Sequence, residues 1–510
     1  MTAVNRIAAP PRPDRLRRTA VRSIAWSAIE TWGSHAVSFA VFLTLARLLD
    51  AEAFGLLSLA MVAIAFLQVF VDQGFGEAII QRETLEPEHL DTSFWTALVV
   101  GLALAAGTAA SASAIASLLN DVRLEAVIRW LAPGFVLTAL STTHRAILRR
   151  SFAFRSLAAR TLVAIVAGGG AGVGAALLGY GVESLVAQAL VQWAVAAGVL
   201  WWLSDWRPRL RFSWRHFRDL FVFGISVTGS QVLNLVNRRS DDLLIGVFLG
   251  PFALGYYTVA NRSVGALAEA FISVTSRVAV PTFSRLQSNR DRMRRALYGA
   301  IRYTSIVAFP GFIGLAALAP EFVEVLFGRQ WMSAVPVMQV LAFIGIVQSI
   351  EMFHGNALLA CGKPAWRLGI SAVNAISNVI AFSIAVRWGI VAVALAYVVR
   401  GYVMLPLSFI LVRRVLGIRL RDHARQWRLP LIGASIMAIA VLSAAEVEGG
   451  SVPVRLIVLL AVATATYGVF LAAFHRNAVR EALTVLHGDR SGSVCVNGFH
   501  EGDSRHRIER

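Results

Sequence analysis

Cysteine and charge are both scarce in this sequence. The 510 residues include two cysteines, Cys361 and Cys495, which exclude a disulfide framework and a cysteine-based metal cluster. Charged residues make up 15% of the chain and hydrophobic residues 57%, whereas soluble domains average about 25% and about 45–50%. A soluble core could not bury so much apolar surface. The composition predicts an all-α integral membrane protein, because lipid offers no hydrogen-bond partners to a crossing segment that is not helical.

Long apolar runs fill the sequence from residue 24 to residue 475. About 20 mostly apolar residues make one helical crossing of a hydrocarbon layer about 30 Å thick. We predict fourteen crossings, at 24–48, 54–73, 93–119, 124–147, 156–178, 182–203, 217–238, 243–265, 298–319, 333–360, 365–386, 389–412, 429–445 and 453–475. An even number of crossings places both termini on the same side of the membrane.

The arginines indicate which side that is. The 48 basic residues are 47 Arg and the single Lys363, and 38 of them fall in the two tails and in alternate loops on the side of the termini. Short cytoplasmic loops retain Arg and Lys, so we expect both termini in the cytoplasm and the protein in the cytoplasmic (inner) membrane. The first apolar run is too long for a cleavable signal and follows a basic tail, so we expect it to remain as an anchor.

The net charge of +18 has the same explanation. The arginines are spread over separate short loops and do not form one basic domain, which argues against nucleic acid as a partner. We expect these loops to lie against anionic membrane lipids.

The sequence also matches itself at an offset of 200 residues. Residues 49–60 overlay residues 249–260, and Leu, Ala, Gly and Ala coincide at four places. Both segments join the first and second crossings of a presumed half, and an offset of six crossings gives the two halves the same orientation. Transporters with parallel repeats place the substrate path between their halves. We expect a cavity lined chiefly by 24–48, 54–73, 217–238 and 243–265.

The repeat and the polar gaps predict the domain organisation, two pseudo-symmetric six-helix bundles followed by two more helices. The parts are a basic cytoplasmic N-terminal tail at 1–23, a bundle at 24–203, a cytoplasmic linker at 204–216, a second bundle at 217–412, two additional crossings at 413–475 and a disordered cytoplasmic tail at 476–510. Residues 74–92 and 266–297 are long enough to include interfacial amphipathic helices.

Polar residues recur inside the predicted crossings. A charge near mid-bilayer costs about 2.5–3.5 kcal/mol on insertion scales, so such residues usually face a cavity or a partner. Gln231, Asn234 and Asn237 form one stripe at three-residue spacing, which leads into Arg238-Arg239. The other groups are Glu30, Thr31, Ser34 and His35; Gln68, Asp72 and Gln73; Asp241, Asp242, Asn261 and Arg262; and Gln348, Glu351 and His354.

Several of these residues also have purely structural interpretations. Asp72, Arg238, Arg239, Asp241 and Asp242 lie close enough to helix ends to be simply solvated. Glu30 and Arg262 could form a buried ion pair that locks two helices together, and His35 could be a packing residue. We predict no catalytic residue and no metal ligand.

Several motifs resemble one known family. The most specific motif is the run from Asp72 to Arg82, followed by Thr92 and Phe94-Trp95. Supporting motifs are Trp26-Ser27-Ala28, Leu45-Ala46-Arg47, Phe54-Gly55, Leu249-Gly250, Gly255-Tyr256-Tyr257, the run from Pro281 to Leu286, Leu326-Phe327-Gly328, Trp331 and Pro336-Val337. With these motifs the chain resembles, from residue 24 to about 400, the polysaccharide-exporter (Wzx-type) branch of the multidrug/oligosaccharidyl-lipid/polysaccharide flippase superfamily, which includes the MATE transporters.

The resemblance implies a flippase that moves an undecaprenyl-pyrophosphate-linked oligosaccharide to the outer leaflet by alternating access, for lipopolysaccharide, capsule or exopolysaccharide biosynthesis. Such a protein is a transporter, not an enzyme; it needs no cofactor, and a proton or sodium gradient would drive it. Its partners would be the lipid-linked substrate, membrane lipids and polysaccharide-assembly proteins such as a polymerase.

The polar residues suit that cargo. Guanidinium groups match phosphate geometry, so Arg47, Arg238, Arg239 and Arg262 are candidate pyrophosphate ligands. The amides of Gln231, Asn234, Asn237 and Asn261 could bind sugar hydroxyls. Candidates for ion coupling or gating are Glu30, His35, Asp72, Glu351 and His354.

Three other functions remain open. A drug or metabolite antiporter of the same superfamily, or a lipid II flippase, would need a similar polar cavity. An integral-membrane glycosyltransferase or polymerase could use Asp241-Asp242 as catalytic carboxylates, but such enzymes usually carry a sizeable outer loop, and the outer loops here do not exceed about a dozen residues.

Overall fold

The computed structural model describes residues 32–287, 289–446 and 451–474, with the backbone alone for 272–281. Within these ranges the regular structure is entirely helical. A first helix covers residues 32–48. The helices up to the linker are α3 (Ala51–Asp72), α4 (Phe75–Gln81), α5 (Pro87–Ala110), α6 (Ala112–Leu118), α7 (Leu124–Leu131), α8 (Gly134–Arg150), α9 (Phe154–Leu177) and α10 (Gly181–Leu203). Those after it are α11 (Trp214–Leu286), α12 (Arg290–Ala317), α13 (Ala319–Leu326), η1 (Arg329–Ala334), α14 (Val335–Ala360), α15 (Pro364–Ala385), η2 (Val386–Trp388), α16 (Ile390–Leu416), α17 (Leu420–Ala445) and α18 (Val452–Phe474).

Twelve of the described helices are long and apolar enough to cross a membrane, so the chain is a multi-pass membrane protein. One of them, Trp214–Phe271, extends over both predicted crossings at 217–238 and 243–265. It reverses direction at Gly250, whose φ of 84° is one that L-residues rarely adopt. The crossing predicted at 24–48 begins outside the described residues. The total of fourteen, and the division into domains, stay predictions.

The boundaries of two predicted segments differ from the structure. The crossing expected at 93–119 is divided between α5, which already begins at Pro87, and the short helix α6. Pro87 occupies the first turn, where its missing N–H costs no hydrogen bond, and this moves the start of the helix ahead of the apolar run. The linker expected at 204–216 is non-helical only over 204–213, because α11 begins at Trp214.

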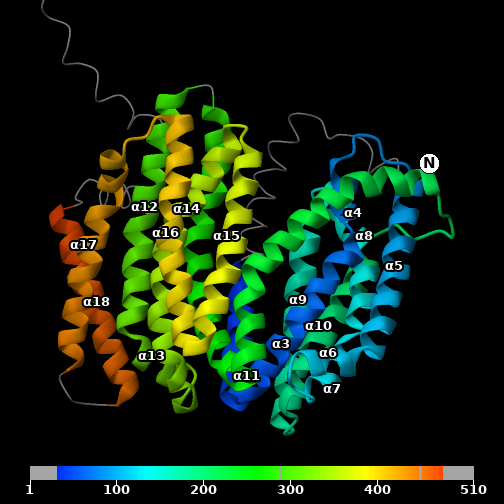
Figure 1. The fold of residues 1–510 in the computed structure, drawn as a ribbon, viewed down its shortest axis with the longest axis horizontal. Coiled ribbons are helices and arrows are strands. Elements are labelled where there is room, and N and C mark those ends of the chain that lie inside the picture. The colour runs from blue at the N-terminus through cyan, green and yellow to red at the C-terminus, as the bar shows by residue number, and fades with distance from the viewer. Residues whose placement is uncertain (1–31, 288, 447–450, 475–510) are drawn as a thin grey trace, which may run out of the picture.

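The helices form two groups (Figure 1). Helices α4 to α10 lie together on one side and α12 to α18 on the other, while α3 and α11 lie between them. The groups come together at the end of the molecule that carries α13, which we call the α13 end. The opposite end carries residues 204–213 and is called the linker end. The predicted topology places the linker end in the cytoplasm.

Two glycines allow the backbones of α3 and α11 to touch near the α13 end. A Cβ atom on Gly55 would lie 1.7 Å from the carbonyl oxygen of Pro251, and a Cβ on Gly255 would lie 1.8 Å from that of Ala51. Gly55 and Gly255 are 200 residues apart in the sequence, and so are their contact partners Pro251 and Ala51. Thr258 donates a hydrogen bond of 3.1 Å to Ser58, another pair at that offset. The sequence repeat therefore corresponds to a pseudo-symmetric helix crossing, which we call the glycine crossing.

Aromatic packing, a hydrogen bond and an ion pair stabilise the α13 end. Phe42 contacts the ring edges of Phe54 and Phe327, at centroid distances of 5.6 and 5.7 Å. Trp331 is fully buried, and its indole N–H donates to the carbonyl oxygen of Ala46 at 2.7 Å. Arg455 of α18 forms an ion pair of 3.2 Å with Glu321 of α13. These contacts connect the first helix, α3 and the second group of helices.

A methyl group at the glycine crossing should separate the two helices. Gly55→Ala places its Cβ against backbone, which cannot rotate away as a side chain can, so we expect the free energy of unfolding to fall by about 1–3 kcal/mol. Thermal unfolding of the purified protein in detergent measures this. Gly107→Ala in α5 is the control, because nothing lies within 4 Å of the added Cβ. Equal melting temperatures for the two variants would contradict the packing described for Gly55.

Candidate functional site

A polar pocket of about 370 Å³ lies where α3 and α11 meet the first group of helices. Helices α3, α8, α9, α10 and α11 all contribute to it. Its polar and aromatic lining residues are Gln68, Asp72, Thr138, Ser141, Arg145, Arg160, Trp193 and Gln231. Such residues are expensive in lipid and are typical of a substrate or ion path.

Helical spacing directs these side chains to one place. Gln68 and Asp72 are four residues apart on α3, and Thr138, Ser141 and Arg145 follow at steps of three and four on α8, so each set lies on one helix face. Gln68 donates a hydrogen bond of 2.6 Å to Thr138, which fixes the two faces against each other.

Two arginines and one carboxylate give the pocket a net positive charge. The side chains of Arg145 and Arg160 are half-buried, and the carboxylate of Asp72 accepts from the backbone N–H of Gly76 at 3.1 Å. Arg145 also attracts that carboxylate electrostatically. An anionic ligand that enters the pocket would meet two guanidinium groups in a site of low dielectric constant, where charge–charge attraction is strong.

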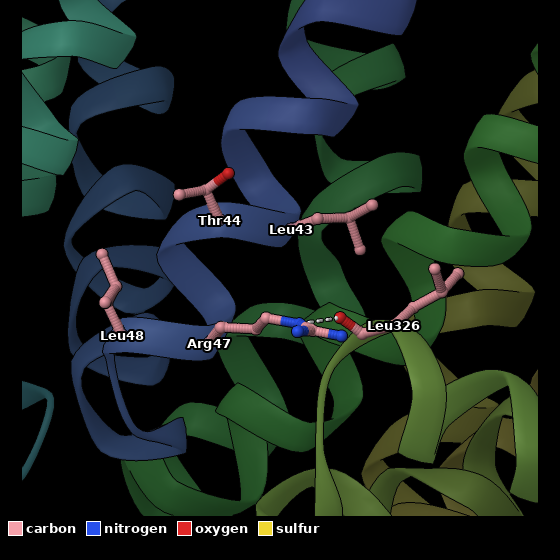
Figure 2. Close-up of a pocket in the computed structure, with 5 residues that line it drawn as sticks. All are labelled: Leu43, Thr44, Arg47, Leu48 and Leu326. Carbon is pink, nitrogen blue, oxygen red and sulfur yellow. Dashed lines mark hydrogen bonds between the residues drawn. The ribbon is translucent and has the colours of Figure 1, made fainter. Parts of the chain in front are cut away.

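Arg47 lies at the α13 end of the molecule, where it contacts the backbone of α13 (Figure 2). Its guanidinium donates to the carbonyl oxygen of Leu326 at 2.8 Å, and also to that of Val325. The adjoining pocket of about 390 Å³ is lined by Leu43, Thr44, Leu48 and Leu326 besides Arg47. In this conformation Arg47 satisfies the carbonyls that end α13, which is what orphan carbonyls at a helix C-terminus require.

The predicted stripe on α11 divides between two environments. Gln231 lines the polar pocket. Asn234 is exposed, whereas the side-chain oxygen of Asn237 accepts a hydrogen bond of 2.7 Å from Asn378 of α15. The stripe therefore runs from the first group of helices to the second, along the helix that lies between them.

The other predicted phosphate ligands also lie on α11. Arg238 is exposed, and Arg239 forms an ion pair of 2.8 Å with Asp242. The guanidinium of Arg262 lies 4.3 Å from the ring centroid of Phe42, in a cation–π contact, and its side chain is exposed. Its neighbour Asn261 is half-buried. The structure does not bring these residues into the polar pocket.

The predicted coupling residues are distributed over both groups. Glu30 lies outside the described residues, so the ion pair considered with Arg262 is not seen. His35 lies 3.8 Å from Glu269 of α11, and both side chains are about half exposed. Glu351 is hydrogen-bonded to Asn374, which in turn accepts from Arg400 at 3.0 Å. His354 is fully buried, with its ring nitrogens 3.0 Å from Ser408 and 3.0 Å from His423.

Asp241 and Asp242, considered above as catalytic carboxylates, are both buried. Asp241 accepts a hydrogen bond of 2.8 Å from the hydroxyl of Tyr257, and Asp242 is held by Arg239. Both carboxylates therefore have a partner in the described structure.

Sequence reasoning missed three groups of polar residues. Arg145 and Arg160 were counted as cytoplasmic loop charges, although Arg145 continues the Thr138–Ser141 spacing that indicates an inward face. Glu269 follows the predicted eighth crossing, 243–265, and is the only acidic residue between Asp242 and Asp291. The third group, Asn374, Asn378 and Arg400, lies in helices α15 and α16, which the repeat alone did not assign to a path.

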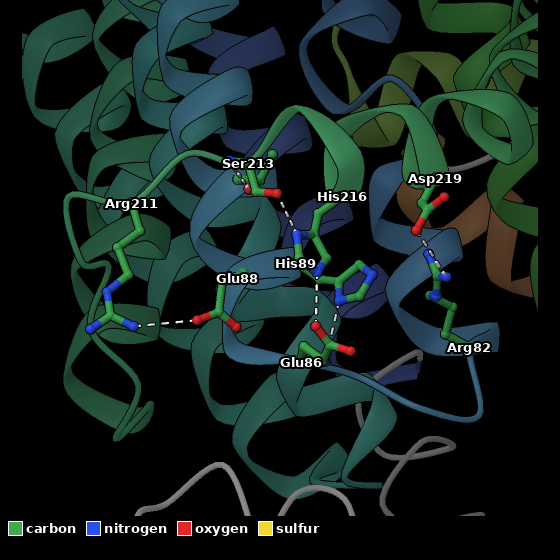
Figure 3. A network of polar contacts seen from close by, with 9 residues as sticks. Arg82, Glu86, Glu88, His89, Arg211, Ser213, His216 and Asp219 are labelled. Atoms are coloured by element: carbon green, nitrogen blue, oxygen red, sulfur yellow. Dashed lines mark hydrogen bonds and ion pairs between the residues drawn. The ribbon is translucent and has the colours of Figure 1, made fainter.

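Polar contacts also hold the linker to the first group of helices at the linker end (Figure 3). Asp91 accepts from the backbone N–H of Arg209 at 3.0 Å, and the indole of Trp95 donates to the carbonyl oxygen of Arg209 at 2.7 Å. Arg211 pairs with Glu88, and Arg82 with Asp219. The hydrogen bond from His216 holds the pKa of the Glu86 carboxyl below its usual value.

Comparison with known proteins finds relatives whose names refer to polysaccharide biosynthesis or transport. A family model described as "Polysaccharide biosynthesis protein" matches residues 44–336. The succinoglycan biosynthesis transport protein ExoT of Rhizobium meliloti (strain 1021) is 28% identical over 472 residues, 91% of this chain and 95% of that protein. The lipopolysaccharide biosynthesis protein WzxC of Escherichia coli (strain K12) is 25% identical over 426 residues, which cover 81% of this chain and 85% of WzxC.

Solved structures with the same fold include two transporters. The lipid II flippase MurJ, in an inward closed conformation, superposes with a TM-score of 0.75 at 14% identity, over 89% of this chain and 100% of MurJ. An inward-facing MATE family multidrug transporter of the MOP superfamily superposes with a TM-score of 0.57 at 16% identity, over 78% of this chain and 98% of the transporter. These findings confirm the family resemblance and a MOP-type fold. Since the family model covers more than half of the sequence, the chain belongs to the polysaccharide biosynthesis protein family.

Proposed function

We propose that this protein moves a lipid-linked oligosaccharide from the inner to the outer leaflet of the cytoplasmic membrane for surface polysaccharide biosynthesis, and that it works as a transporter without enzymatic activity. The names of its relatives support this, because they refer to transport and biosynthesis of succinoglycan and lipopolysaccharide. The proposed carrier lipid is undecaprenyl pyrophosphate.

The positively charged pocket is the observation that carries the proposal. A lipid-linked oligosaccharide has an anionic pyrophosphate, a polar glycan and an apolar tail, and only the tail partitions into the hydrocarbon layer of the bilayer. Arg145 and Arg160 would bind the pyrophosphate, since guanidinium forms paired hydrogen bonds with phosphate oxygens. Gln68, Thr138, Ser141 and Gln231 supply the neutral donors and acceptors that sugar hydroxyls need.

The exposed polar residues of α11 extend the path beyond this pocket. Asn234, Arg238 and Arg262 are accessible in the described structure, and Asn261 and Arg239 adjoin them. They suit successive contacts with the glycan and pyrophosphate as the cargo passes between the two groups of helices. Arg47 would join the path when its contacts to Leu326 and Val325 break.

The glycine crossing supports alternating access with this conformation closed at the α13 end. Direct backbone contact holds α3 and α11 together at that end. With the termini and the linker in the cytoplasm, as proposed, the α13 end faces outward. Release of cargo to the outer leaflet then requires the helices to part at Gly55 and Gly255.

A proton or sodium gradient would drive the cycle without any bound cofactor. The pair His35–Glu269 joins the first helix to α11 and is partly exposed, so a change in its protonation would alter the attraction between the two. Glu351, Asp72 and His354 are further candidates. A polymerase and other assembly proteins would receive the flipped substrate.

The proposal is tested by reconstitution with a labelled lipid-linked oligosaccharide. We expect leaflet transfer well above that in protein-free vesicles under at least one ion gradient. Arg145→Gln and Arg160→Gln should each lower transfer about 10- to 100-fold, the cost of losing a hydrogen bond to a charged group. Arg129→Gln is the control, because Arg129 is an exposed partner of Glu125 on α7, outside the pocket.

Three results would count against this proposal. Leaflet transfer equal to that of protein-free vesicles under every gradient would rule out the flippase function. Selective transfer of lipid II or of a cationic drug would support the corresponding alternative. Full transfer activity in both arginine variants would show that the substrate does not bind in the pocket.

A disulfide across the glycine crossing should block transport reversibly. The side-chain oxygens of Ser58 and Thr258 are 3.1 Å apart, so Ser58→Cys and Thr258→Cys place two thiols within reach of each other. In a background without Cys361 and Cys495, oxidation should stop leaflet transfer and dithiothreitol should restore it. Each single variant is the control. Undiminished transfer in protein shown by mass spectrometry to be cross-linked would mean that the crossing does not open.

A further inference from the structure

Three potential metal ligands meet where the linker joins α11. Glu86 precedes α5, His89 lies in the first turn of α5, and His216 lies in the first turn of α11. One carboxylate oxygen and one ring nitrogen from each histidine lie within 4.8 Å of one another. Figure 3 shows both rings directed at Glu86.

The two histidines are held in place before any ion binds. His89 and His216 are only 3% and 9% exposed, and their rings pack edge to face with centroids 4.2 Å apart. The Nδ1 atom of His216 is 2.6 Å from the hydroxyl of Ser213. A partner on the second ring nitrogen is the usual way in which proteins orient a metal-binding histidine.

One further ring nitrogen of each histidine contacts Glu86, at its carboxylate for His216 and at its backbone N–H for His89. The Nε2 atom of His216 is 2.9 Å from a carboxylate oxygen of Glu86. His89 accepts the backbone N–H of Glu86 through Nδ1 across 3.2 Å, so its lone pair already points toward the same residue. A cation bound through Nδ1 of His89 would replace this long hydrogen bond and would draw the three ligands together. Glu86 can move inward because its side chain is largely exposed.

The surrounding charges are nearly balanced. Arg82, which approaches His89, is paired with Asp219 at 3.5 Å, and Arg211 is paired with Glu88 at 3.3 Å. Arg215 also attracts the carboxylate of Glu86. The carboxylate of Glu86 therefore remains available to offset part of the charge of a divalent ion.

We propose that Glu86, His89 and His216 bind one Zn²⁺ ion at the linker end, with water in the fourth position. Two imidazoles and one carboxylate are a ligand set that zinc uses, whereas Mg²⁺ prefers oxygen ligands alone. The bound ion would cross-link the start of α5 to the start of α11. It would add a metal bond to the contacts that already hold residues 204–213 against the first group of helices.

The test is zinc binding to the full chain, purified in detergent, freed of its tag and stripped with a chelator. Isothermal titration at pH 7.5 should show one equivalent of Zn²⁺ and none of Mg²⁺, and zinc should raise the melting temperature. Ser213→Ala should weaken zinc binding about 10- to 100-fold, as removal of a ligand's orienting partner does. His89→Gln and His216→Gln should weaken it further.

At pH 5.5 the affinity of the unaltered protein for zinc should fall, because protonated imidazole does not bind metal.

Two matched variants separate this site from other histidines and carboxylates. His423→Gln alters the buried His354–His423 pair, and Glu88→Gln alters the neighbouring ion pair; both should keep one equivalent of zinc. Melting temperatures without zinc check that each variant is folded. Zinc binding in the unaltered protein no stronger than in His216→Gln, or loss of binding in His423→Gln, would overturn the proposal.

Discussion

The backbone contact between α3 and α11 is the constraint on which the arrangement of the two groups of helices depends. Lipid tails are as apolar as leucine, so helices in a membrane associate through close packing more than through the hydrophobic effect. At Gly55 and Gly255 the backbones come closer than any side chain would permit. The contact draws the two groups together at the α13 end, and the aromatic cluster of Phe42, Phe54 and Trp331 packs around it.

The general architecture was predictable because it follows from local sequence. Apolar runs of sufficient length indicate crossings wherever they occur, and the 200-residue repeat predicted that the segments around Gly55 and Gly255 are equivalent. The same reasoning failed at Pro87, which starts α5 ahead of its apolar run. The two crossings predicted at 217–238 and 243–265 correspond to the two arms of α11, but the chain reverses at Gly250, inside the second predicted crossing, because a change of direction at a single glycine leaves no polar gap.

The candidate site was less predictable because pocket residues are identified by neighbours from other helices. Arg145 looks the same in sequence whether it faces the cytoplasm or Gln68 and Asp72 across a pocket. Arg47 matched a family motif, yet its guanidinium contacts the backbone of residues almost 280 positions later. Gln231 lines the polar pocket, but its stripe indicated only a polar environment. Which environment it faces depends on how α11 packs against α3 and α10.

The glycine crossing also sets an order for assembly of the protein in the membrane. Gly55 and its partner Pro251 are separated by almost 200 residues, and chains grow at about 5–20 residues per second. The glycine face of α3 therefore meets its partner about 10–40 s after it has been made. Until then the first group of helices must remain inserted without this contact. Only once α11 has been made can its backbone pack against that of α3 at the α13 end.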